Sequence, residues 1–149
     1  MKNILFVLTF CISSFVIAQE SAPPPPAEPT PENKILIDEL IKVTEYENYF
    51  NNYCKNKVEQ AAQEGNWNEK RKKEIIESIK FKYFNNAIYN AFASDSKENL
   101  NQAIVLFKNL NSQRSDHILK TVPMNAMLQF NLDGFVKSLL HGKYMVSSY

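Results

Sequence analysis

Apolar residues recur at helical spacing in the first part of the folded region, and this pattern predicts a long helix. At about 100° per residue, one narrow apolar stripe runs from about Pro31 to Glu64. Thr30 is placed as the N-cap, with a proline at the first helical position, and Gly65 as the stop. The stripe consists of Leu36, Leu40, Val43, Phe50, Cys54, Val58 and Ala61. Such a stripe is typical of a helix packed against others in a bundle.

A second helix is expected from about Asn68 to Ala93, after a turn at Trp67. Its apolar residues occupy more than half of its circumference, which is typical of a central helix. They are Ile76, Ile79, Phe81, Tyr83, Phe84, Ala87, Ile88, Ala91 and Phe92. The cations from Lys70 to Lys73 oppose the helix dipole in the first turn, so we expect solvent and neighbouring acids to hold them. We place this helix in the core of the bundle.

A third helix is predicted after Asp95, because Asp95 and Glu98 have the spacing of a capping box. Its apolar face consists of Leu100, Ala103, Ile104, Phe107 and Leu110. The segment 109–115 is polar and lacks helical periodicity, so it is expected to be a loop. A short helix or single turn is expected over residues 116–122, where Pro123 breaks it or opens the next helix.

The last predicted helix runs from about Pro123 to His141 and ends at Gly142. Its apolar stripe consists of Met124, Leu128, Leu132, Phe135, Val136 and Leu139. Gly134 weakens the middle of this helix by roughly 1 kcal/mol relative to alanine. The tail from Lys143 on is expected to be frayed or only loosely docked. Since no stretch alternates as a strand does and no fixed period repeats, the sequence predicts an all-α fold, a small bundle of four to five helices.

The segment before the helices has the features of a secretory signal peptide. Lys2 precedes an apolar run from Ile4 to Val16, and Val16 and Ala18 fit a small-residue cleavage site. A membrane anchor is the alternative, but hydroxyl residues interrupt the run, which is shorter than the roughly 20 residues that a bilayer span needs. We therefore expect a signal peptide over residues 1–18, a periplasmic or secreted protein, and no integral membrane span after cleavage.

Residues 19–31 are expected to form a Pro-rich linker. The prolines from Pro24 to Pro26 have no amide donors and favour extended polyproline II. This linker is expected to act as a semi-rigid spacer that holds the domain off the export machinery or the envelope. The alternative is a ligand for a proline-recognising module. Residues 32–149 then form a single helical domain.

The charge balance indicates no particular class of partner. The 149 residues carry 17 Lys+Arg and 16 Asp+Glu, a formal net charge of +1. The sequence shows no basic stripe of the kind that binds nucleic acid, so no nucleic-acid partner is expected. The composition, 44% hydrophobic and 22% charged, is that of one ordinary globular domain.

No set of residues in the sequence has the spacing of a catalytic or metal site. His117 and His141 lie on different segments, and neither has a partner at metal-ligand spacing. Cys54 falls on the apolar stripe, where a thiol is usually a small buried hydrophobe. Cys11 belongs to the expected signal peptide, so no internal disulfide is expected. We expect a protein that is not an enzyme and that uses no cofactor and no metal.

The candidate partner or ligand face lies on the first helix and the turn after it. It consists of Tyr46, Glu47, Tyr49, Tyr53 and Trp67. Glu47 interrupts the apolar stripe, either as a polar group within a ligand cavity or as an edge residue that pairs with a lysine or reaches solvent. The three tyrosines form an adjacent stripe that either packs within the bundle or faces a partner, with Trp67 extending it. The phenylalanines, Phe130 among them, are expected in the core.

Between residues 81 and 125 the chain carries three groups of residues in a fixed order. They are Ile88, Tyr89 and Phe92, then Glu98, Leu100, Ile104 and Phe107, then Ile118, Leu119, Lys120 and Pro123. This order resembles domain of unknown function 2059, a family of exported bacterial helical proteins with a capped helix ending in an aromatic pair, a Ser-Pro-x-Gly turn, and a short helix before a proline. Here Phe107-Lys108 stands at the aromatic pair and the proline-free segment 109–115 at the turn. The resemblance implies a helical fold and export rather than an activity.

These features together lead to two expectations of function. The first is an exported helical protein that acts by contact with an unidentified protein partner in the cell envelope or outside the cell. The alternative is a carrier of a small hydrophobic ligand or lipid, with an aromatic-lined cavity in which Glu47 or a tyrosine hydroxyl fixes the polar end of the ligand.

Overall fold

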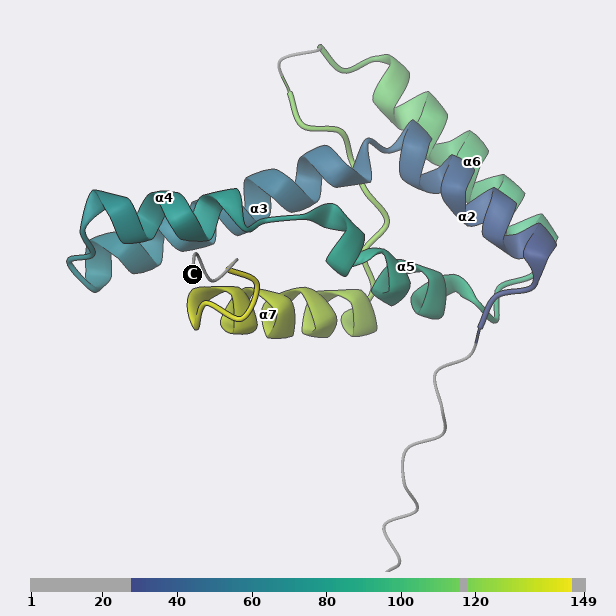
Figure 1. The fold of residues 1–149 in the computed structure, drawn as a ribbon. Helices are drawn as coiled ribbons and strands as arrows, with labels where there is room; N and C mark the ends of the chain where they lie inside the picture. Colours follow the sequence, from purple (N-terminus) through teal and green to yellow (C-terminus); the bar gives the residue numbers. More distant parts are fainter. Residues whose placement is uncertain (1–27, 116–117, 146–149) are drawn as a thin grey trace, which may run out of the picture.

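The computed structural model describes residues 28–115 and 118–145, and these residues form an all-helical fold (Figure 1). The described helices are α2 (Pro31–Val43), α3 (Tyr46–Glu64), α4 (Glu69–Glu77), the 3₁₀ turn η2 (Phe81–Tyr83), α5 (Asn85–Phe92), α6 (Lys97–Ser112) and α7 (Ala126–Leu140). The prediction of an all-α fold is confirmed. The expected signal peptide, most of the Pro-rich linker and His117 lie outside the described residues.

The helices form two groups in space (Figure 1). α2 and α6 lie side by side as a pair, and α3, α4, α5 and α7 make up the larger group. α3 joins the two groups, because it follows α2 through a short turn, pairs with α4 and packs against α7. The central position therefore belongs to α3 and not to the predicted helix over residues 68–93.

The prediction of one helix over residues 31–64 is wrong, because the chain breaks between α2 and α3 at Thr44 and Glu45. The Thr44 hydroxyl donates to the Leu40 carbonyl at 2.7 Å, a side-chain bond that competes with continuation of the helix. Glu45 then takes a left-handed backbone conformation with φ of 50°. A straight helix is thereby replaced by two helices with different directions.

The break changes which side chains are buried. In α2 the buried apolar residues are Ile37 and Leu40. In α3 they are Tyr46, Phe50, Cys54, Val58 and Ala62. Three residues of the predicted stripe, Leu36, Val43 and Ala61, are only half-buried. The predicted ends are correct: the Thr30 hydroxyl accepts from the Asn33 amide, and Gly65 follows the last residue of α3.

The predicted helix over residues 68–93 divides into α4, η2 and α5. The Ser78 hydroxyl donates to the Ile75 carbonyl at 2.7 Å, and Lys80 is extended with φ of −135°. The predicted start is correct, because the Asn68 side chain accepts from the Arg71 amide at 2.8 Å. The prediction of one continuous central helix is therefore wrong, since a local side-chain bond ends α4 before the aromatic residues begin.

Phe50 of α3 lies at the centre of the aromatic core. Its ring centroid is 5.5 Å from that of Phe81, 5.2 Å from that of Phe84 and 5.1 Å from that of Phe135. Aromatic pairs at such distances contribute about 0.5–1.5 kcal/mol each beyond the burial of their area. Rings from η2, from the start of α5 and from α7 thus meet on one side chain of α3, which explains why α3 is central.

α7 supplies the other large part of the core, on the predicted stripe. Its buried residues are Leu128, Leu132, Phe135, Val136 and Leu139. The helix begins at Ala126 rather than at Pro123, because Asn125 is the N-cap and its side chain accepts from the Leu128 amide at 2.8 Å. Gly142, with φ of 78°, follows the end of the helix as predicted.

The described part of the C-terminal tail packs on the core, so the prediction of a frayed or loosely docked tail is wrong for residues 143–145. The Tyr144 ring stacks on Phe135 with centroids 4.7 Å apart, and on Tyr83 at 5.2 Å. The left-handed conformation of Gly142 turns the chain back toward α7, so that the Tyr144 ring reaches Phe135 and Tyr83. The tail is thereby joined to both α7 and η2.

α6 differs from the prediction at both ends. Its N-cap is Ser96, whose hydroxyl accepts from the Asn99 amide at 3.2 Å, and not the adjacent Asp95. The helix continues to Ser112, into the segment predicted as a loop, and residues 118–122 form no helix. In the last turn of α6, the buried Asn111 side chain exchanges hydrogen bonds of 2.7 and 3.0 Å with the Thr121 backbone, and these bonds join the end of α6 to the segment before α7.

Candidate functional site

The three tyrosines predicted on one stripe form a row of neighbouring rings on α3, with centroids 5.9 Å apart for Tyr46 and Tyr49 and 6.1 Å for Tyr49 and Tyr53, but they differ in burial. Tyr46 is only 1% exposed, and its hydroxyl donates to the Pro123 carbonyl at 3.3 Å. Burial raises the pKa of Tyr46 well above its ordinary value. Of the two alternatives for the tyrosines, Tyr46 therefore takes packing within the bundle and does not belong to an exposed partner face, because the turn at Glu45 directs the first residue of α3 into the core.

Tyr49 and Tyr53 are half-buried, and Tyr53 takes part in a polar cluster between α3 and α7. The Tyr53 hydroxyl donates to Asp133 Oδ1 at 2.8 Å, and the Gln129 amide donates to the same oxygen at 3.0 Å. These bonds hold the pKa of Asp133 below its ordinary value of 3.8. Burial, and then the bond to Asp133, raise the pKa of Tyr53. The polar atoms satisfy one another, so the cluster connects two helices and offers few groups to a partner.

Glu47 lies in the first turn of α3 with its side chain exposed. A carboxylate there interacts favourably with the positive end of the helix dipole. Glu47 therefore reaches solvent, and the interpretation as a polar group within a ligand cavity is wrong. The apparent interruption of the stripe came from extending one helix through the turn at Thr44.

Trp67 lies in the turn between α3 and α4 and is half-buried. The Arg71 guanidinium carbon lies 4.0 Å from the centroid of the Trp67 ring, a cation–π arrangement. About 16 Å of helix separate Tyr53 from the end of α3 at Glu64. The structure therefore does not bring Trp67 together with the tyrosines, and the five predicted face residues do not form one exposed face.

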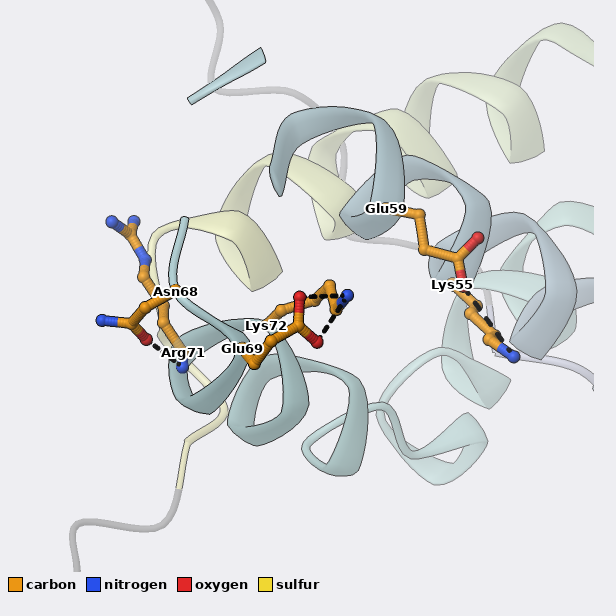
Figure 2. A network of polar contacts seen from close by, with 6 residues as sticks. All are labelled: Lys55, Glu59, Asn68, Glu69, Arg71 and Lys72. Carbon is orange, nitrogen blue, oxygen red and sulfur yellow. Dashed lines mark hydrogen bonds and ion pairs between the residues drawn. The ribbon is translucent and has the colours of Figure 1, made fainter. Parts of the chain in front are cut away.

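The charged residues around this turn form local pairs (Figure 2). Lys72 contacts Glu69 at 2.7 Å within α4, and Lys55 contacts Glu59 at 3.9 Å within α3. Pairs of this kind at exposed positions contribute only about 0.3–0.5 kcal/mol each. The acids expected to hold the basic first turn of α4 are thus present, and this surface is a solvated face without a binding geometry of its own.

An apolar groove lies between α5 and α7, and we call it the α5–α7 groove. Its volume is about 260 Å³, and it is open to solvent. Its lining includes Tyr83, Ala87, Phe130, Asn131, Gly134 and Tyr144. The Phe130 side chain is 78% exposed and that of Tyr83 is 49% exposed. A Cβ added at Gly134 would meet nothing within 4 Å, so the absence of a side chain there contributes open space.

The α5–α7 groove has a basic rim and an uncharged lining. Lys82 Nζ lies 5.2 Å from the centroid of the Tyr83 ring, and Lys143 Nζ lies 5.7 Å from that of Tyr144. Both lysines are exposed, and the two tyrosines stack on each other. A ligand of the groove would therefore meet aromatic rings first and two cations at one wall, which suits an apolar segment that carries negative charge.

The groove was missed in the sequence because its residues come from η2, α5, α7 and the tail. One signal was present at Phe130, which lies about 200° around the helix from Leu128, opposite the apolar stripe. The prediction of Phe130 in the core is wrong, since this rotation directs the ring to solvent. Gly134, one turn later on the same side, is the second part of that signal.

Two other side chains of the described chain that could react or bind a metal, Cys54 and His141, lie outside the groove. Cys54 is fully buried, and burial raises the pKa of its thiol to about 12, so the thiolate needed for reaction does not form near neutral pH. His141 is exposed. Within residues 28–115 and 118–145 no group of three His, Cys, Asp or Glu could hold a metal ion. No helix in these ranges is both long and apolar enough to cross a membrane.

No family model, no curated protein and no solved structure matches this chain. The resemblance to domain of unknown function 2059 therefore stays a prediction.

Proposed function

We propose that this protein is exported and acts by contact with another protein, in the cell envelope or outside the cell, through the α5–α7 groove. The main support is Phe130, a large aromatic side chain that is 78% exposed on a helix whose opposite face belongs to the core. Full burial of such a side chain contributes about 1.5–3 kcal/mol. Aromatic anchors that enter a pocket dominate the energy of many protein interfaces.

The position of Phe130 on α7 favours binding for a second reason. The buried face of α7 holds the helix against Phe50 of α3 through Phe135. A groove on a helix fixed in this way needs little ordering when a partner binds, so less of the gross binding energy is lost. The polar groups at the lining, among them Asn131, are available to the backbone of a partner.

Export is supported by the features of residues 1–18 and by the resemblance described above. In an exported protein with one cysteine after residue 18, the core rather than a disulfide provides stability. The aromatic cluster around Phe50 is consistent with that requirement. Mass spectrometry of the protein from its host is expected to show a chain that begins at Gln19, as glutamine or as its cyclised pyroglutamate form, and an intact Met1 would contradict the proposed export.

Photo-cross-linking from position 130 tests the proposed contact. Phe130 is replaced by p-benzoylphenylalanine in the living host, and cross-linked products are identified by mass spectrometry. The matched control carries the same group at Lys55, an exposed position on α3. One discrete cross-linked protein from position 130 and none from position 55 would support the proposal. Equal or no cross-linking at both positions would contradict it.

The alternative is a carrier of a small hydrophobic ligand or lipid. The aromatic lining of the α5–α7 groove favours this function, but the groove is open and its 260 Å³ lie below the roughly 300–1,000 Å³ of typical ligand pockets. Native mass spectrometry of protein purified from its host separates the two functions. Additional mass that organic extraction removes would favour the carrier, and a protein of its own mass alone favours contact with a partner.

A further inference from the structure

We propose that the α5–α7 groove holds the Pro-rich segment of the same chain, with the prolines 23–26 against its aromatic rings. This inference rests on the proposed function, because it takes the groove to be the binding surface. It adds a regulatory contact, since a protein partner must then displace the segment before it reaches Phe130.

The chemistry of the segment fits the lining of the groove. A run of prolines favours a polyproline II helix, which loses little entropy on binding and docks in grooves lined by aromatic rings. The groove offers the exposed rings of Tyr83 and Phe130, and the ring of Tyr144 at one wall. Its lining also holds Asn131 and Ser138, whose polar groups can bond to the carbonyls of such a helix.

The charges of the segment and of the groove are opposite. Residues 19–30 contain Glu20 and Glu28 and no lysine or arginine. The rim of the groove carries Lys82 and Lys143 beside its two tyrosines, and the lining carries no charge. Complementary charges of this kind favour the encounter and fix the orientation more than they add affinity.

The place where the chain enters the fold brings the segment within reach. The Asn33 side chain, in the first turn of α2, donates to the Asp95 carbonyl at 2.8 Å, just after α5 ends. α5 is about 12 Å long, and Ala87 of the groove lies in its first turn. In polyproline II the seven residues from Thr30 back to Pro23 span about 22 Å, at about 3.1 Å per residue. The segment is therefore long enough to pass along α5 and reach the groove.

The tether also makes a weak contact sufficient. A binding segment on a short flexible connection has an effective concentration in about the millimolar range. A contact of millimolar affinity is therefore substantially populated in one molecule, and dilution does not release it. A partner with higher affinity for Phe130 would displace the segment without any change in the helices.

A spin label at Ala22→Cys tests the inference in protein purified after export. The buried Cys54 thiol, with its pKa raised to about 12, does not compete for the label. We expect the amide NMR signals of Asn131, Gly134 and Ser138 to lose at least half of their intensity. The amides of Lys55 and Glu59, on the outer face of α3, are expected to keep theirs.

Two further variants and a mixed sample complete the test. Gly134→Leu fills the open space of the groove, so in this variant the amide signals of the groove residues are expected to regain their intensity. Replacement of prolines 23–26 by serine is expected to have the same effect. Gly134→Ala leaves the groove open and is expected to retain the loss of intensity. Absence of the loss in the labelled chain, or an equal loss in Gly134→Leu, would overturn the inference. An equal loss when spin-labelled chains are mixed with separate, unlabelled ¹⁵N chains would assign the occupant to a second copy and overturn it as well. The cross-link from position 130 does not use the label, so either proposal can fail alone.

Discussion

Gly134 and Gly142 are expected to respond in opposite directions to the same substitution. Gly134 lies inside α7, where a Cβ would meet nothing within 4 Å. Alanine is about 0.8–1.0 kcal/mol more favourable than glycine in a helix interior. Because no contact opposes this difference, Gly134→Ala should raise the free energy of unfolding by about 1 kcal/mol, which corresponds to a melting temperature higher by roughly 3–5 °C.

Gly142 follows α7 with φ of 78°, and a Cβ there would lie 3.0 Å from the Met145 sulfur. The left-handed conformation costs a residue with a Cβ about 1–2 kcal/mol. The gain from a less flexible unfolded chain, about 0.4–1 kcal/mol, offsets part of this cost. Gly142→Ala should therefore lower the free energy of unfolding by about 1 kcal/mol.

Urea denaturation followed by circular dichroism at 222 nm measures both changes, with an equal slope in the two variants as the sign that only stability has changed. The difference between the two variants should be about 2 kcal/mol, the sum of the two effects. A destabilised Gly134→Ala would mean that a side chain of the helical fold fills the space beside Gly134, and the groove would not exist as described. A neutral Gly142→Ala would contradict the turn that brings Tyr144 onto the core.

Three further predictions concern the core, a helix cap and a titrating cluster. Phe50→Ala should lower the free energy of unfolding by about 3–5 kcal/mol in chemical denaturation, because three rings contact Phe50, whereas the exposed Phe130→Ala should change it by less than about 0.5 kcal/mol. Ser96→Ala should cost about 1 kcal/mol through loss of the α6 cap, and Asp95→Ala should cost less than half as much; the reverse order would restore Asp95 as the cap. Because the pKa of Asp133 is lower in the folded state than its ordinary value of 3.8, its carboxylate contributes stability that is complete above pH 3.8 and is lost as the pH falls through the folded-state pKa. The free energy of unfolding of the wild type should therefore decrease between about pH 4 and pH 2 more steeply than that of Asp133→Asn. Parallel curves for the two proteins would contradict the cluster.

Apolar periodicity in the sequence was sufficient to predict a helix and its buried residues where the buried contacts lie along one face of that helix. The stripe of α7 from Leu128 to Leu139 was predicted correctly, because its members are buried on one side of one helix, whereas Met124, the first predicted member, precedes α7 and is half-buried. The same reasoning failed at Thr44 and Ser78, where a hydroxyl bonds to the backbone and ends the helix. Thr44 and Ser78 are the only serine or threonine residues in those two predicted helices, but a hydroxyl residue alone does not indicate a break, since Ser138 lies inside α7.

The candidate site was less predictable than the fold. Tyr46, Tyr49 and Tyr53 do share one stripe of α3, but Tyr46 is buried, and the sequence does not indicate which end of that stripe enters the core. The α5–α7 groove requires Tyr83 and Tyr144 to meet, and these come from distant parts of the chain. Their contact depends on packing around Phe50 and Phe135, which no local pattern encodes.

The most direct test of the account compares cross-linking from position 130 in three backgrounds. With p-benzoylphenylalanine at position 130, wild-type Gly134 and Gly134→Ala should give the same cross-linked protein, because a methyl group leaves the groove open. Gly134→Leu should remove this product although its stability is at least that of the wild type. A cross-linked product that is unchanged in Gly134→Leu would contradict the claim that the α5–α7 groove is the surface through which this protein acts.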